Sequence, residues 1–62
     1  MDRIPTVERA FEIAKSGSCH TLSDVRRQLS VEGYADGAAQ TAGPSIKRQL
    51  QALIAAARRE AP

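Results

Sequence analysis

Apolar side chains recur every three or four residues in three stretches of this 62-residue chain. In the first stretch the apolar positions are Ile4, Val7, Phe11 and Ala14, and Ala10 and Ile13 widen the stripe. This spacing predicts an amphipathic helix over residues 4–16. Pro5 suits the first turn of that helix, Asp2 and Thr6 are candidate caps, and Gly17 is placed to end it in the left-handed conformation.

A second helix is predicted over residues 22–32, and its buried stripe consists of Leu22, Val25 and Leu29. Thr21 stands immediately before it, in the position where a hydroxyl accepts a hydrogen bond from the backbone of the first turn. Asp24 follows three residues later and can reach back to the N–H of the cap residue. The pair predicts a variant of the capping box at the start of this helix.

A glycine at position 33 indicates where the second helix ends. Glu32 is the expected C-cap and Gly33 the residue beyond it, where a left-handed conformation is common. In the Schellman motif the next residue packs back on the last turn, so Tyr34 is expected to lie against Leu29. We therefore interpret Tyr34 as a structural plug rather than a binding aromatic.

Residues 35–43 contain two glycines and no large apolar side chain, and this composition predicts a mobile loop. Pro44 suits the first turn of a third helix, predicted over residues 44–59, with Thr41, Gly43 and Ser45 as candidate caps. The apolar stripe of this helix consists of Ile46, Leu50, Leu53, Ile54 and Ala57.

Three amphipathic helices with short connections predict an all-α fold, a small three-helix bundle that forms one domain over residues 1–62. Valine, isoleucine, leucine and phenylalanine together supply 12 of the 62 residues, so the core is thin for a chain of this length. Self-association is one way in which such a chain gains the stability that its own core lacks.

The residues with nucleophilic or near-neutral acid–base character are Cys19 and His20, which are adjacent in a connector. Catalytic thiol and imidazole groups normally converge from separate elements, and a structural zinc site needs four ligands. We expect no enzyme activity, catalytic residue, metal site, cofactor or small-molecule substrate; Cys19 is expected in the core and His20 in solvent.

The location of the protein is predicted from the same composition. A single cysteine is typical of a reducing compartment. No apolar run approaches the roughly 18 residues of a membrane span, and the first residues do not resemble a signal peptide. These features predict a cytoplasmic protein without a membrane partner.

Charge is distributed unevenly along the chain. Residues 1–40 carry five basic and six acidic side chains, whereas residues 41–62 carry four basic side chains and one acidic one. No acidic residue occurs between Asp36 and Glu60, so the cations of the third helix lack partners three or four positions away. On a helical projection Lys47, Gln51 and Arg58 form one row, and Arg48 and Arg59 form another. Two basic rows separated by small side chains are suited to phosphate contacts.

The order of the second and third helices resembles a helix-turn-helix unit over roughly residues 21–54. That resemblance implies that the third helix reads bases near its N-terminus, where arginine and glutamine side chains stand. The connector is longer than the three- or four-residue turn of that motif. The alternative interpretation is that these cations form a solvated basic face, and that Arg58 and Arg59 stabilise the negative end of their own helix.

The whole chain is also similar to a set of short bacterial proteins with no assigned function. The shared pattern is RAFE-A-SG, then D-RR-L-EGY, then GPS-RQL-ALI, found here within residues 9–17, 24–34 and 43–54. The resemblance implies a cytoplasmic, single-domain protein and does not distinguish between partners.

Two functional hypotheses follow. The first is a non-enzymatic module that binds DNA or RNA through Lys47, Arg48, Gln51, Arg58 and Arg59. The second is a protein-interaction module, most simply a homodimer that buries Leu53, Ile54 and the alanines at 55–57. Phosphate binding weakens steeply with salt and apolar association does not, so salt dependence distinguishes the two.

Overall fold

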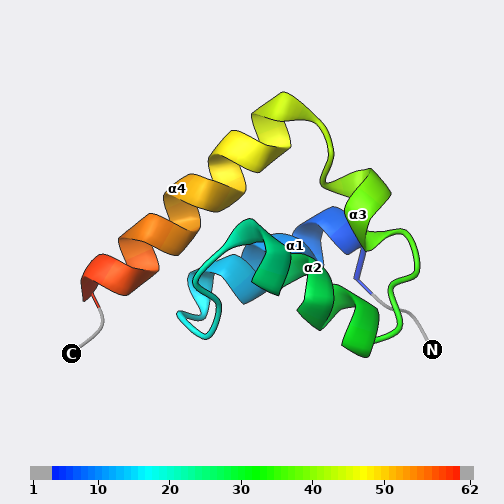
Figure 1. The fold of residues 1–62 in the computed structure, drawn as a ribbon, viewed down its shortest axis with the longest axis horizontal. Coiled ribbons are helices and arrows are strands. Elements are labelled where there is room, and N and C mark those ends of the chain that lie inside the picture. Colours follow the sequence, from blue (N-terminus) through cyan, green and yellow to red (C-terminus); the bar gives the residue numbers. More distant parts are fainter. Residues whose placement is uncertain (1–3, 61–62) are drawn as a thin grey trace.

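The computed structural model describes residues 4–60, and all regular secondary structure in that range is helical. The helices are α1 (Thr6–Lys15), α2 (Leu22–Val31), α3 (Gly37–Gln40) and α4 (Pro44–Glu60) (Figure 1). α1 contacts each of the other three helices, and α4 packs chiefly along α1. The predicted all-α bundle of three main helices is confirmed, with one short helix in addition. No helix in residues 4–60 is long and apolar enough to cross a membrane.

The core lies where α1, α2 and α4 meet. Its buried apolar residues are Ala10, Ile13, Ala14, Cys19, Val25, Leu29, Leu50 and Ile54. The small side chains of Ala10 and Ala14 are fully buried, and this lets neighbouring helices approach α1 closely. Cys19 is buried as predicted.

The start of α1 differs from the prediction. The helix begins at Thr6 rather than residue 4, and Pro5 occupies the N-cap position without a side-chain cap bond. The Thr6 hydroxyl does not cap the helix, because it donates to Oδ1 of Asp36 at 2.8 Å. The other candidate cap, Asp2, lies outside the described residues. At the far end Gly17 has a φ of 83°, which confirms the predicted left-handed stop.

Both predicted ends of α2 are confirmed. The Thr21 side chain accepts from the N–H of Asp24, and the Asp24 carboxylate accepts from the N–H of Thr21. Gly33 has a φ of 92°, and the N–H of Tyr34 donates to the carbonyl of Leu29 at 2.9 Å, which is the long bond of the Schellman motif. The Tyr34 ring packs against the core and its hydroxyl donates to the carbonyl of Ile4 at 3.0 Å. Tyr34 is therefore a structural plug.

The prediction of a loop over residues 35–43 was wrong at its centre, where α3 forms one helical turn. Gly37 is buried against Leu29, and a Cβ at that position would lie 3.0 Å from the Cβ of Leu29. Thr41 is fully buried; its hydroxyl donates to the carbonyl of Gly37 at 2.8 Å and accepts from Nε of Arg26 at 3.0 Å. The segment is held by close backbone packing and a polar cluster, neither of which needs a large apolar side chain.

α4 begins at Pro44, as predicted, and the carbonyl of Gly43 accepts from the N–H of Lys47 at 2.9 Å. Thr41 is not its cap, because the hydroxyl is committed to α3 and Arg26. Leu50 and Ile54 are buried, while Ile46 and Leu53 pack at the edge of the core. This orientation of the apolar stripe decides which side of α4 faces outward.

Candidate nucleic-acid interface

The outward side of α4 carries the predicted binding residues. Because Leu50 and Ile54 point into the core, the positions outside this apolar stripe face away from the bundle. All five candidates are exposed, namely Lys47, Arg48, Gln51, Arg58 and Arg59. The structure therefore presents them together on one helix, as the sequence analysis predicted for a solvent-facing surface.

The four cations of this set form no ion pair with another described residue. This separates them from Arg9, whose guanidinium lies 2.6 Å from Glu32 and 3.0 Å from Glu12. It also separates them from Arg26, which donates to the hydroxyl and the carbonyl of Thr41. These side chains therefore form no ion pair that holds residues 4–59 together, and Arg58 and Arg59 lie in the last turn of α4, where a positive charge favours the negative end of the helix dipole.

The cations stand in two pairs along α4. Lys47 and Arg48 lie in the first turns, and Arg58 and Arg59 lie in the last turn. Eleven residues separate corresponding members of the pairs, which at the rise of an α-helix is about 16 Å. On the side of α4 between the two basic rows, Gln51 and the small Ala55 are exposed. A helix with this arrangement can reach phosphates at both of its ends while its middle approaches a nucleic acid closely.

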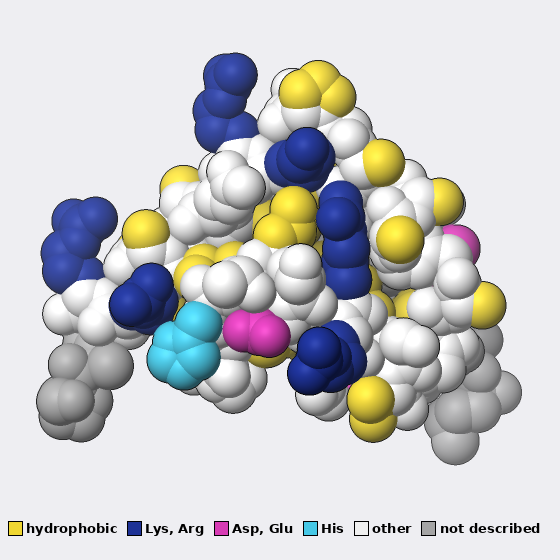
Figure 2. All heavy atoms as spheres, in the orientation of Figure 1, with side chains coloured by type: hydrophobic (Ala, Val, Ile, Leu, Met, Phe, Trp, Pro, Cys, Tyr) yellow, Lys and Arg dark blue, Asp and Glu magenta, His cyan; other side chains and the backbone are white. Residues whose placement is uncertain are grey.

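Figure 2 shows the surrounding surface in the orientation of Figure 1. Lysine and arginine side chains stand along α4 and continue over α2, and acidic side chains are sparse between them. Arg27 of α2 is exposed, and Arg26 is partly buried in its contact with Thr41. The basic surface therefore extends from α4 onto α2, which the sequence analysis did not predict because it depends on how the two helices pack.

A depression of about 290 Å³ lies between the start of α2 and the second half of α4. Its lining brings Gln51 and Arg58, two of the predicted residues from one row, together with His20 and Thr21. His20 is exposed, as expected. The place of His20 on this surface could not be predicted from the sequence, because the contact joins segments about 30 positions apart in the chain.

Beside that depression, backbone N–H groups at the N-terminus of α2 are hydrogen-bonded to the side chain of Asp24. The Asp24 carboxylate accepts from the N–H groups of His20 at 3.1 Å and Thr21 at 3.2 Å. The hydrogen bond from the His20 backbone is the main cause that holds the pKa of Asp24 below its usual range. The N–H groups of His20 and Thr21 are thus already bound to a carboxylate.

Cys19 and His20 are adjacent in the chain but lie in different surroundings. Cys19 is 5% exposed, whereas the adjacent His20 side chain is turned to solvent. Within residues 4–60 no group of three or more histidine, cysteine or acidic side chains is arranged to hold a metal ion.

The connector between α2 and α4 contains α3 and is not a single tight turn. α4 packs mainly on α1, with a smaller contact to α2.

Comparison with protein families, curated proteins and solved structures gives no match to this chain. The resemblances to a helix-turn-helix unit and to short bacterial proteins stay predictions.

Proposed function

We propose that the protein is a non-enzymatic module that binds nucleic acid through the exposed side of α4. The observation that supports this most is the set of four exposed cations on α4 that have no anionic partner among the described residues. Phosphate groups are the partners that such a set attracts, and release of their counterions supplies the binding free energy.

Each residue of the surface has a role that follows from its position. Lys47 and Arg48 contact phosphates at one end of α4, and Arg58 and Arg59 do so at the other. Gln51, between the pairs and exposed, is positioned to contact base edges or sugars. Non-specific affinity for a handful of phosphates is expected at about 10⁻⁴ to 10⁻⁶ M at physiological salt.

The proposal is tested by the salt dependence of binding to a labelled DNA or RNA duplex, measured by fluorescence anisotropy. Lys47→Gln and Arg48→Gln should each weaken binding and lower the slope of log affinity against log salt by about one. The matched control is Gln40→Glu, which changes the net charge by the same amount at an exposed side chain on α3, a helix that does not contact α4.

The control should leave the slope nearly unchanged. If Gln40→Glu and Lys47→Gln weaken binding equally, the attraction comes from net charge alone and the α4 surface is not the site. An affinity that does not change with salt would also contradict the proposal.

A further inference from the structure

An apolar groove of about 460 Å³ runs between α1 and α4, lined by Phe11, Lys15, Gln49, Ala52 and Leu53. It continues along α4 past Ala56 and Ala57. Leu53 follows Gln51 by two positions, about 200° around the helix, so the groove lies on the opposite flank from the row of Lys47, Gln51 and Arg58. Phe11, the one phenylalanine of the chain, is only partly buried there.

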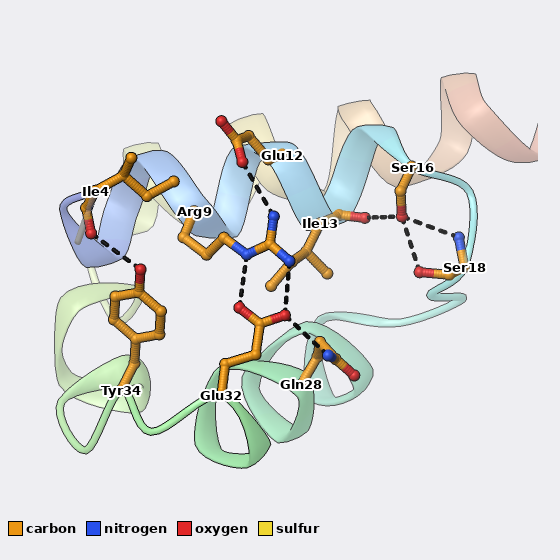
Figure 3. Close-up of polar contacts among 9 residues, drawn as sticks. All are labelled: Ile4, Arg9, Glu12, Ile13, Ser16, Ser18, Gln28, Glu32 and Tyr34. Carbon is orange, nitrogen blue, oxygen red and sulfur yellow. Dashed lines mark hydrogen bonds and ion pairs between the residues drawn. The ribbon is translucent and has the colours of Figure 1, made fainter. Parts of the chain in front are cut away.

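The exposed row of α1 beside the groove has opposite charges at its two ends. Glu8, Phe11 and Lys15 follow one another at three- and four-residue spacing, so they share one side of the helix. Glu8 and Lys15 are exposed, and neither forms an ion pair with another described residue. Glu12 differs, because its carboxylate accepts from Arg9 at 3.0 Å (Figure 3).

A two-fold axis relates identical surfaces, so a homodimer interface must be complementary to itself. An axis that passes α1 near Phe11 places the two copies of α1 antiparallel. Glu8 of one copy then stands opposite Lys15 of the second copy, and the same contact occurs twice. The acidic start and basic end of this row are what such a pairing requires.

We propose that the α1–α4 groove is the interface of a two-fold homodimer in which Glu8 of each copy faces Lys15 of the other. Phe11 of each copy lies in the groove of the other, where Ala52 and Ala56 leave room for a close approach. Burial of these apolar groups adds to a thin core: among residues 4–60, the fully buried side chains larger than alanine are Val25, Leu29, Leu50 and Thr41.

This interface differs from the one expected from the sequence, which centred on Leu53, Ile54 and the alanines that follow. Ile54 is 4% exposed and belongs to the core of its own chain, so it is not available to a second copy. The structure moves the interface toward α1 and leaves Lys47 and Arg58 outside it.

Sedimentation velocity over a wide range of protein concentration tests the proposal. The wild-type chain should pass from monomer to dimer as concentration rises. Glu8→Lys and Lys15→Glu, each tested alone, should raise the dimer dissociation constant by about tenfold, because two attractive contacts become repulsive. The double variant Glu8→Lys with Lys15→Glu restores opposite charges and should dimerise like the wild type.

The double variant also separates association from folding. Glu8 lies in the first turn of α1 and Lys15 in the last, so both reversals weaken α1 through its dipole, and circular dichroism should show the larger loss in the double variant. An equimolar mixture of the two single variants should form heterodimers, because every cross-copy pair is then oppositely charged.

A wild-type chain that stays monomeric at every concentration would overturn the proposal, and so would a double variant that associates no better than the single ones. Lys47 and Arg58 lie on the flank of α4 away from the groove, so Lys47→Glu with Arg58→Glu should weaken nucleic-acid binding and leave dimerisation intact. Failure of one proposal therefore does not conceal the state of the other.

Discussion

Arg9 in the middle of α1 forms a bidentate contact with Glu32 at the C-cap of α2 (Figure 3). Nε of Arg9 lies 2.6 Å from Oε1 of Glu32, and Nη2 lies 2.6 Å from Oε2. The carboxylate also accepts from Nε2 of Gln28 at 2.9 Å. Hydrogen bonds to Glu32 and then Glu12 raise the pKa of Arg9 further above its ordinary value. The contact fixes where α2 ends relative to α1.

Arg9→Gln should therefore lower thermal stability more than Arg48→Gln, which removes the same charge from a side chain without a described partner. Arg9→Lys keeps the charge but loses the planar two-bond geometry, so it should fall between wild type and Arg9→Gln. Thermal unfolding followed by circular dichroism measures the order. Equal melting temperatures for Arg9→Gln and Arg48→Gln would show that the contact adds nothing to stability.

Gly37→Ala should destabilise the protein by about 1 kcal/mol, because an added Cβ would overpack against the fully buried Leu29 side chain. That Cβ would lie 3.0 Å from Cβ and 3.2 Å from Cδ1 of Leu29. Gly43→Ala is the control, since a Cβ there meets nothing within 4 Å. Urea unfolding should place the control within about 0.5 kcal/mol of the wild type. A stabilising effect of Gly37→Ala would mean that α3 does not pack closely on α2.

Gly33→Val should lower the free energy of unfolding by at least about 1 kcal/mol, because a β-branched residue is poorly tolerated at positive φ. The φ of 92° at Gly33 sets this requirement. Gly33→Asn should cost less, since asparagine adopts left-handed conformations more readily. Chemical denaturation of both variants gives the comparison, and a neutral Gly33→Val would contradict the Schellman motif.

Asp24 should make stability depend on acid pH. The pKa of Asp24 is lowered in the folded chain, chiefly by the hydrogen bond from the N–H of His20. Its carboxylate therefore adds to the free energy of unfolding above the pKa of the unfolded chain, about 3.9, and this contribution is lost as pH falls through the folded pKa. Asp24→Asn should therefore be less stable than the wild type at neutral pH, and the difference should shrink in strong acid. Thermal melts across this range test the sign; a constant difference would exclude a role for the charge.

The parts of the fold that sequence predicted well are those set by local signals. The capping box of Thr21 and Asp24 and the glycine stop at Gly33 depend on residues within a few positions of each other, so their spacing is sufficient. α3 has no such signal. It depends on Gly37 meeting Leu29 and on Arg26 reaching Thr41 across 15 positions, contacts that only the packed chain creates.

The same distinction applies to the candidate site. Helical periodicity predicted two basic rows on the last helix, one beside the apolar stripe and one on the far side. All five residues are exposed, Lys47, Gln51 and Arg58 in the first row and Arg48 and Arg59 in the second. It did not predict that His20 and Thr21 lie beside Gln51 and Arg58, because the approach of α2 to α4 is set by the core.

Titration of isotopically labelled protein with DNA and RNA at low salt, followed by amide NMR shifts, tests the α4 interface most directly. If α4 binds nucleic acid, we expect shifts over residues 45–59 that are larger at Lys47, Arg48 and Gln51 than at the buried Leu50 and Ile54. These shifts should be lost as salt rises.

Lys47→Glu with Arg48→Glu should abolish the shifts while leaving helix content nearly unchanged, because both side chains are exposed. If the amide signals of α4 do not shift with either nucleic acid at low salt, the protein does not bind nucleic acid through α4.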